Sequence, residues 1–264
     1  MTSALTGRFA ARLLAAALLS LPLAVPAAVA APASCTVSGQ AAALAAPLPH
    51  VTENLAAGEP LRIVAIGSSS TAGAGASDAD HSYPARLAHH LHQGLPGQDI
   101  TVLNKGINGE VGADMLKRFR RDVLEQDPDL VVWQVAANSV LRNLDPAAAE
   151  EVIRDGVRQL KAAGLDVVLM DLQYAPAMLE KPVHDEMQAR IARVAAEEGV
   201  GLFRRFALMR QWVETRQAAM SDLVGGDGLH QNDFGYDCVA RALAASIQDA
   251  AGLRPVGHAS LHRP

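Results

Sequence analysis

The sequence lacks basic runs and has fewer basic than acidic side chains. It holds 23 lysines and arginines against 28 aspartates and glutamates, which gives a formal net charge of −5 at pH 7. Binding to nucleic acid requires a concentrated basic face, so this balance argues against nucleic acid as a partner. The charges are interspersed, and no polybasic stretch indicates a membrane-binding surface.

Several familiar functional motifs are also missing. The glycines at 67, 73 and 75 are not followed by the Lys-Ser/Thr pair that a phosphate-binding loop requires. The stretch 67–71 is not the Gly-x-Ser-x-Gly turn of α/β-hydrolases. The histidines at 89, 90 and 92 have no second cluster to complete a metal site. The sequence therefore predicts no cofactor and no metal, and the histidines are expected on a solvated helix face.

The N-terminus has the pattern of an export signal. Two arginines precede an apolar run at 13–30, which ends in the small-residue sequence Ala-Val-Ala at Ala30. This pattern predicts a secretory signal peptide at 1–30, cleaved after Ala30. The alternative is a transmembrane anchor, which two prolines within the run disfavour. We expect a periplasmic or secreted protein with no stable membrane insertion after cleavage.

The chain has 2 cysteines, Cys35 and Cys238. An even number in an oxidising compartment favours a disulfide, which would tie the mature N-terminus to the last predicted helix. The alternative is two separate buried thiols.

Beyond the signal peptide we expect a leader segment at 31–60, one domain at 61–252 and a C-terminal tail at 253–264. Residues 36–60 are rich in Ala, Pro and Gly with little periodicity, so they are expected on the surface. Half of the residues are hydrophobic, enough for a full core. A single α/β domain can exceed 200 residues.

From residue 61 onwards, short apolar runs alternate with helical periodicity. The expected strands are 61–67, 100–103, 130–135, 167–171 and 200–206. The expected helices are 83–95, 113–126, 145–164, 183–198, 209–220 and one that begins near 233. This alternation predicts a three-layer α/β/α fold with a flavodoxin-like, doubly wound, parallel five-stranded sheet of order 2-1-3-4-5.

Polar residues follow the first three strands, at 68–70, 104–109 and 136–139. In this strand order the three loops are neighbours at the carboxyl edge, where open α/β sheets bind ligands. A serine hydroxyl there needs a base, and His230 can supply it, with Asp227 accepting from the other ring nitrogen. The backbone N–H groups of Ser69 and Gly109 and the side-chain amide of Asn138 can form an oxyanion hole.

These motifs resemble the SGNH hydrolases of the GDSL superfamily over most of 61–250. Residues 66–71, IGSSST, match the first block and make Ser69 the nucleophile. Gly109 and Asn138 fall at the glycine and asparagine of the second and third blocks, and 227–236, DGLHQNDFGY, match the last block. The resemblance implies a triad of Ser69, Asp227 and His230 and an oxyanion hole of Ser69, Gly109 and Asn138.

Three positions depart from the family pattern. Ser68 replaces the aspartate of Gly-Asp-Ser, Ala136 replaces a glycine, and Ser139 replaces an aspartate that braces neighbouring loops. The resemblance implies a serine ester hydrolase that acts through an acyl-enzyme on short-acyl carbohydrate or lipid esters. Two alternatives stay open: a periplasmic O-acyltransferase with the same triad, and a non-catalytic carbohydrate-binding protein on a decayed SGNH site. The sequence does not indicate an oligomeric state.

Overall fold

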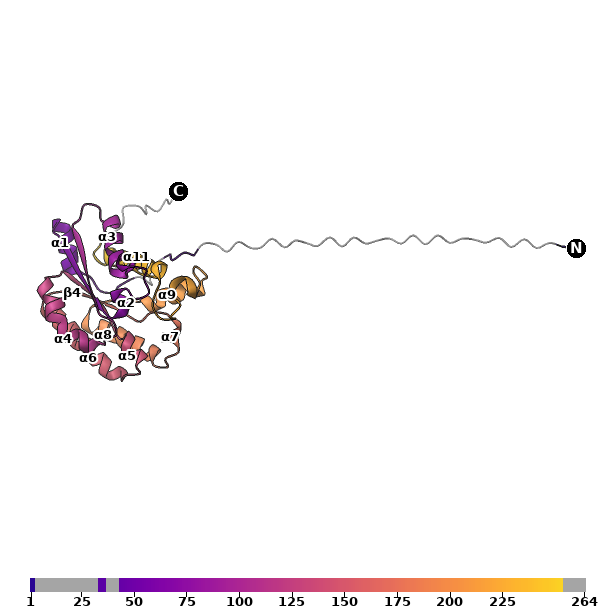
Figure 1. Ribbon diagram of the computed structural model, residues 1–264. Coiled ribbons are helices and arrows are strands. Elements are labelled where there is room, and N and C mark those ends of the chain that lie inside the picture. The colour runs from indigo at the N-terminus through magenta and orange to yellow at the C-terminus, as the bar shows by residue number, and fades with distance from the viewer. Residues whose placement is uncertain (3–32, 37–42, 254–264) are drawn as a thin grey trace. The chain divides into compact units, whose positions relative to one another are not determined.

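The computed structural model describes residues 1–2, 33–36 and 43–253 (Figure 1). The predicted signal peptide, apart from its first two residues, and the tail beyond residue 253 lie outside the described residues. The fold belongs to the compact unit that begins at Ala33. Among the described residues, no helix combines the length and the apolarity needed to span a membrane.

Five parallel strands form one sheet in the order β2-β1-β3-β4-β5, which confirms the predicted fold. The strands are β1 (Leu61–Gly67), β2 (Ile100–Gly106), β3 (Leu130–Gln134), β4 (Asp166–Met170) and β5 (Gly201–Phe203). In β1, side chains of Ile63 and Ala65 enter one core cluster, and those of Val64 and Ile66 enter the other. The sheet is therefore buried on both faces, as parallel sheets are.

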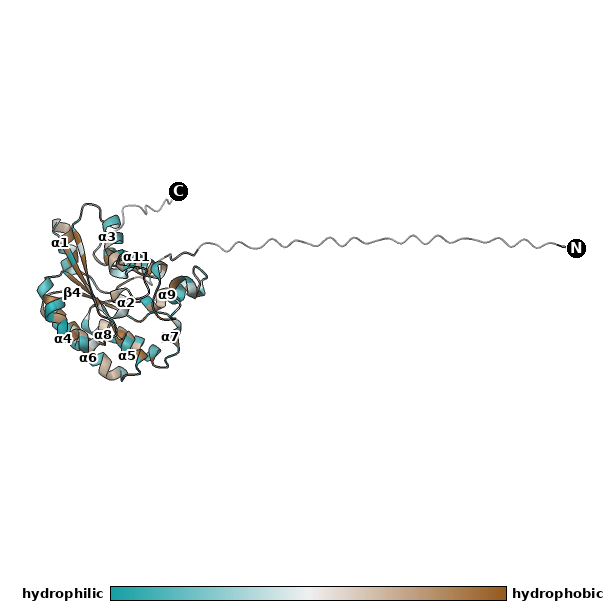
Figure 2. Ribbon diagram, in the orientation of Figure 1, coloured by the Kyte–Doolittle hydropathy of each residue, from teal (hydrophilic) through white to brown (hydrophobic). Residues whose placement is uncertain are grey.

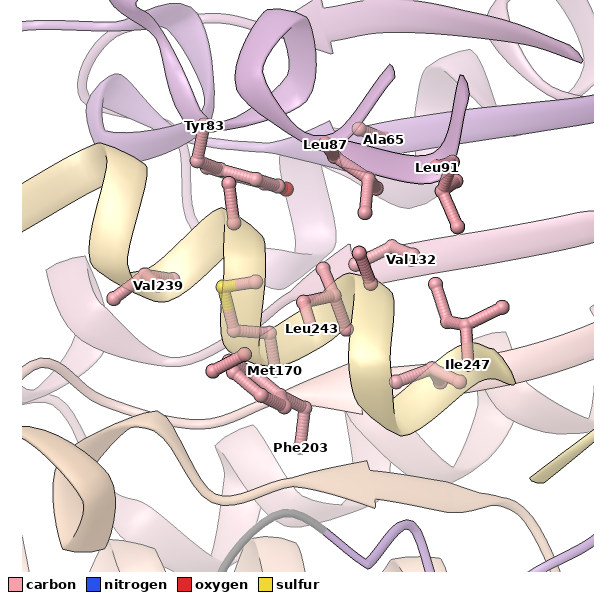
Figure 3. Close-up of a cluster of buried hydrophobic side chains, with 14 of the residues drawn as sticks. Ala65, Tyr83, Leu87, Leu91, Val132, Met170, Phe203, Val239, Leu243 and Ile247 are labelled. Atoms are coloured by element: carbon pink, nitrogen blue, oxygen red, sulfur yellow. The ribbon is translucent and has the colours of Figure 1, made fainter. Parts of the chain in front are cut away.

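Helices cover both faces of the sheet, and Figure 2 shows apolar strands between helices of mixed polarity. On one face, α3 (Tyr83–Gly94) and α11 (Asp233–Ala250) pack together over the strands (Figure 3). On the other lie α4 (Gly112–Asp122), α6 (Pro146–Ala162) and α8 (His184–Glu198). The remaining helices are α1 (Pro49–Ala57), α2 (Ser69–Ala72), η1 (Ala79–His81), η2 (Leu124–Gln126), α5 (Ala137–Leu141), α7 (Pro176–Leu179), α9 (Arg205–Glu214) and α10 (Met220–Leu223).

The expectation that residues 36–60 lie on the surface holds for most of their described part but is wrong for four apolar side chains. Leu48, Val51 and Leu55 are buried in the same core cluster as α3 and α11, and α1 carries two of them. Leu44 is buried too, and its carbonyl accepts the N–H of Leu202 on β5. Three of these apolar residues, Leu48, Val51 and Leu55, are spaced by three and four, which is a helical pattern.

Several predicted boundaries are also wrong. The second strand continues to Gly106 rather than ending at 103, and the helix expected at 113–126 is α4 followed by the short helix η2. The fifth strand ends at Phe203 rather than at 206, because α9 begins at Arg205. The helix expected at 209–220 is instead the end of α9 followed by the separate turn α10. Asp145 caps α6, since its Oδ1 accepts the N–H of Ala147 at 2.9 Å.

Cys35 and Cys238 form a disulfide, as the sequence favours. The bridge joins the described residues at 33–36 to α11 across 203 residues of chain. Both cysteines are buried.

Candidate active site

Ser69 lies where β1 ends at the carboxyl edge of the sheet, as the first residue of α2. The preceding residue is fixed by β3: the N–H and hydroxyl of Ser68 both donate to Gln134 Oε1, at 2.9 and 3.0 Å. A Cβ at Gly67 would lie 2.8 Å from the same oxygen, so only glycine fits there. Gln134 therefore supports this loop, although the family aspartate is absent from position 68.

The structure brings Ser69, His230 and Asp227 together. His230 Nε2 lies 2.8 Å from Ser69 Oγ, and His230 Nδ1 lies 2.5 Å from Asp227 Oδ2. With the ring proton on Nδ1, the imidazole donates to the carboxylate and accepts the serine hydroxyl proton at Nε2. The geometry suits activation of a serine hydroxyl for nucleophilic attack.

Asp227 is held by the turn that it begins. Its Oδ1 accepts the N–H groups of Leu229 and His230 at 2.9 and 3.0 Å, while Oδ2 faces the imidazole. Desolvation acts to raise the pKa of Asp227, but hydrogen bonds from Leu229 and His230 outweigh it and hold the pKa below its usual range. The side chain stays a carboxylate, which favours the Nδ1–H tautomer of His230.

Two of the three predicted oxyanion residues, Gly109 and Asn138, lie in a second group of side chains and loops. Asn138, on α5, donates its side-chain Nδ2 to the carbonyl of Glu110 at 2.9 Å, which fastens it to the loop that holds Gly109. This contact uses one of the two amide hydrogens of Asn138. The carbonyl of Gly109 accepts from Arg142 Nη2, and Gly109 has a φ of +79°, in the left-handed region that favours glycine. The two residues are neighbours, as expected.

The departure at position 136 has a structural consequence. Ala136 caps α5 with a φ of 67°, the left-handed conformation that the usual family glycine adopts without strain. Ser139, the third departure from the family pattern, is buried on the same short helix. The turn is therefore retained at the cost of backbone strain at Ala136.

Sequence reasoning missed two supporting residues. Gln134 is fully buried, and a polar side chain that ends an otherwise apolar strand run is the signal that marks it. Arg118 on α4 is 7% exposed and donates to the carbonyl of Gly67 at 3.1 Å, directly before the Ser68–Ser69 turn. Helical spacing places Arg118 on the same face of α4 as Met115 and Asp122, both buried, whereas Arg120 and Arg121 lie off that face.

An apolar cavity of about 340 Å³ adjoins this cluster. It lies between the start of α4, α5 and the start of α6, and its lining residues are Val111, Gly112, Ala113, Ala136, Ser139, Leu144, Asp145, Ala148, Ala149, Val152 and Ile153. Two of them, Ala136 and Ser139, flank Asn138 within the turn. Among the described residues, no three His, Cys, Asp or Glu side chains are grouped so that they could hold a metal ion.

Known proteins match most of this chain. A model of the non-GDSL lipase-like family matches residues 34–253. The arylesterase of Vibrio mimicus is 27% identical over 168 residues, which are 64% of this chain and 79% of that protein. The acetylxylan esterase of Geobacillus stearothermophilus is 27% identical over 185 residues, which are 62% of this chain and 80% of that protein.

Solved structures show the same fold at lower identity. The crystal structure of Axe2, an acetylxylan esterase from Geobacillus stearothermophilus, has a TM-score of 0.61 and 22% identity, over 74% of this chain and 95% of that one. A two-domain esterase active on acetylated mannans has a TM-score of 0.66 and 21% identity, over 82% of this chain and 56% of that one. The chain belongs to the non-GDSL lipase-like family within the SGNH hydrolases, and it is a carboxylic ester hydrolase.

Proposed function

We propose that this protein is an exported serine ester hydrolase that acts through an acyl-enzyme, with Ser69 as nucleophile, His230 as base and Asp227 as the residue that orients His230. The observation that carries the proposal is the continuous contact from Ser69 Oγ through the imidazole of His230 to Asp227 Oδ2. The disulfide between Cys35 and Cys238 supports export, because such bonds persist in oxidising compartments.

The geometry supports the following sequence of steps. Ser69 Oγ attacks the ester carbonyl carbon while its proton passes to His230 Nε2. The oxyanion is stabilised by the N–H groups of Ser69 and Gly109 and by the remaining amide hydrogen of Asn138. The C–O bond to the alcohol breaks, and the alcohol leaves with the proton from His230. Water, deprotonated by His230, then attacks the acyl-enzyme. Collapse of the second intermediate breaks the C–O bond to Ser69, releases the carboxylic acid and returns the proton from His230 to Ser69 Oγ.

We propose short-acyl esters of carbohydrates or lipids as the substrates. Relatives include the acetylxylan esterase of Geobacillus stearothermophilus and the thioesterase 1/protease 1/lysophospholipase L1 of Escherichia coli, which is 25% identical over 152 residues. A panel of p-nitrophenyl esters of increasing acyl length, followed by acetylated sugars, separates these classes.

The two alternatives make different predictions. An O-acyltransferase with the same triad passes the acyl group to a sugar hydroxyl, so it turns over little ester without an acceptor. The esterase relatives favour hydrolysis. A decayed, non-catalytic site is disfavoured by the hydrogen-bonded contacts among Ser69, His230 and Asp227.

The decisive test is turnover of p-nitrophenyl acetate and butyrate by the mature protein, compared with Ser69→Ala and Ser70→Ala. Ser69→Ala is expected to lose at least about 10³-fold in kcat and to lose labelling by a fluorophosphonate probe. Ser70→Ala, one residue along the same helix, should keep both. Full activity in Ser69→Ala would overturn the proposal.

A further inference from the structure

One buried guanidinium touches two of the loops that carry the proposed reaction. Arg118 extends from α4, and its Nη2 donates to the carbonyl of Gly67 at 3.1 Å. Its Nε donates to Glu110 Oε2 at 2.7 Å, and its Nη1 donates to Asp122 Oδ2 at 2.9 Å. All three nitrogens of the fork therefore have partners, and the side chain is 7% exposed.

The partners of Arg118 lead directly to the proposed nucleophile and oxyanion hole. The carbonyl of Gly67 belongs to the peptide that enters Ser68, one residue before Ser69, and it also accepts the N–H of Ile107. Glu110 follows Gly109, and its own carbonyl accepts the amide of Asn138. The guanidinium thus reaches the strand end that carries Ser69, and it also holds the side chain of the residue that binds Asn138.

We propose that Arg118 is a positioning residue for the oxyanion hole. It fixes the loop of Gly109 and Glu110, and with it Asn138, relative to the backbone of Ser69. This inference rests on the proposed function, in which these groups stabilise the transition state. Such stabilisation depends on donors held at the right place before the reaction, and a displacement of about 1 Å can cost about 100-fold in rate.

The chemistry of the contacts requires arginine at this position. The Gly67 carbonyl, the Glu110 carboxylate and the Asp122 carboxylate are met by separate nitrogens of one planar, rigid fork. A lysine carries the same charge but presents one compact ammonium group, so it cannot span the same three acceptors. Arg118→Lys therefore tests geometry with the charge retained.

Arg154 offers a matched control away from the site. It lies on α6 with a side chain 12% exposed, and it pairs with Glu150 at 3.0 Å and with Glu197 at 2.6 Å. The contact with Glu150 lies within α6 and the contact with Glu197 joins α6 to α8, so neither reaches the loops around Ser69. Arg154→Met should therefore lower stability as a buried ion-pair loss does, without changing catalysis.

The experiment measures kcat and KM for p-nitrophenyl butyrate, inhibition by an alkyl boronic acid, and thermal unfolding, for the full chain and its Arg118→Lys, Arg118→Met and Arg154→Met variants. We expect both Arg118 variants to lose about 10- to 100-fold in kcat, with KM changed by less than about threefold. The affinity for the boronic acid should fall in parallel with kcat/KM, because the tetrahedral boronate binds the same hydrogen-bond donors as the transition state. Arg154→Met should keep kcat within about twofold.

Two results would overturn the inference: kcat within about twofold of wild type in folded Arg118→Lys, or unchanged boronate affinity in a variant with reduced kcat. If Arg118→Met does not fold, the lysine variant decides, because it retains the buried charge. Full turnover by Ser69→Ala would instead overturn the proposed function, and so the two failures are distinguishable.

Discussion

Ser69 Oγ lies 2.8 Å from His230 Nε2, although 161 residues separate the two in the chain. Ser69 is placed by the end of β1, and His230 by the loop that precedes α11. The contact forms because α11 packs with α3 over the face of the sheet that contains Ala65 (Figure 3). The core thus brings the two loops to one edge of the sheet.

Replacing Asp227 should lower kcat, because His230 loses its orientation, without lowering the stability of the fold. In Asp227→Asn, the amide can present an N–H to Nδ1 and so favour the imidazole tautomer that cannot accept the Ser69 proton. We expect kcat for p-nitrophenyl butyrate to fall by about 10³-fold, with thermal unfolding nearly unchanged. The control is Asp185→Asn, whose carboxylate is 84% exposed, and it should change neither kcat nor thermal unfolding. A loss below about tenfold in Asp227→Asn would contradict the assigned role.

Replacing Ala136 by glycine should relieve strain. Ala136 has a φ of 67°, which costs an L-residue about 1 kcal/mol or more relative to glycine. The greater freedom of glycine in the unfolded chain offsets part of this gain. Urea unfolding should therefore show Ala136→Gly to be about 0.5 kcal/mol more stable than wild type. Ala137→Gly, at the next residue and within α5, should be destabilised by about 1 kcal/mol.

Removing the disulfide should lower stability without abolishing the site. The bridge from Cys35 to Cys238 closes a loop of 203 residues, for which the chain-entropy model gives roughly 5 kcal/mol. Cys35→Ala/Cys238→Ala should unfold at lower urea concentration, by at most this amount, and should retain kcat. Thiol titration of the unfolded, unreduced wild type should find no free thiol, and two free thiols would rule out the bridge.

Asp171 should make stability depend on pH. Burial raises its pKa to about 7, against the N–H of Phe206 and the nearby charges of Arg205 and Arg204, which lower it. Between about pH 4 and 7 Asp171 is protonated in the folded state but ionised in the unfolded state. Its contribution to the free energy of unfolding is therefore complete at low pH and is lost as the pH rises to about 7.

Asp171→Asn cannot ionise and should remove this dependence. The wild type loses about 1.4 kcal/mol of stability for each pH unit between pH 5 and the pKa of Asp171, and the variant does not. The stability of the variant relative to wild type should therefore be about 2–3 kcal/mol greater at pH 8 than at pH 5. Urea unfolding at the two pH values measures this difference. An equal gain at both would show that Asp171 does not titrate in this window.

The sequence alone determined the frame of the protein. Apolar runs and helical spacing predicted the parallel strands, because burial on both faces of a parallel sheet leaves a pattern within each short segment. The doubly wound topology of such alternating sequences then supplied the strand order. The motifs at Ser69 and at 227–230 identified residues that the fold brings within hydrogen-bonding distance. The pair Cys35 and Cys238 was the only cysteine pairing that the composition allowed.

Only the tertiary structure shows which distant segments contact the N-terminal segment and the Ser69 loop. The spacing of Leu48, Val51 and Leu55 indicates a helix locally, but their burial depends on a core built by distant helices, which an Ala- and Pro-rich segment does not reveal. Gln134 and Arg118 support the Ser69 loop through contacts with Ser68 and Gly67 across 66 and 51 residues. Hydrogen-bond partners of this kind depend on which strands and helices become neighbours, and local periodicity carries no record of that choice.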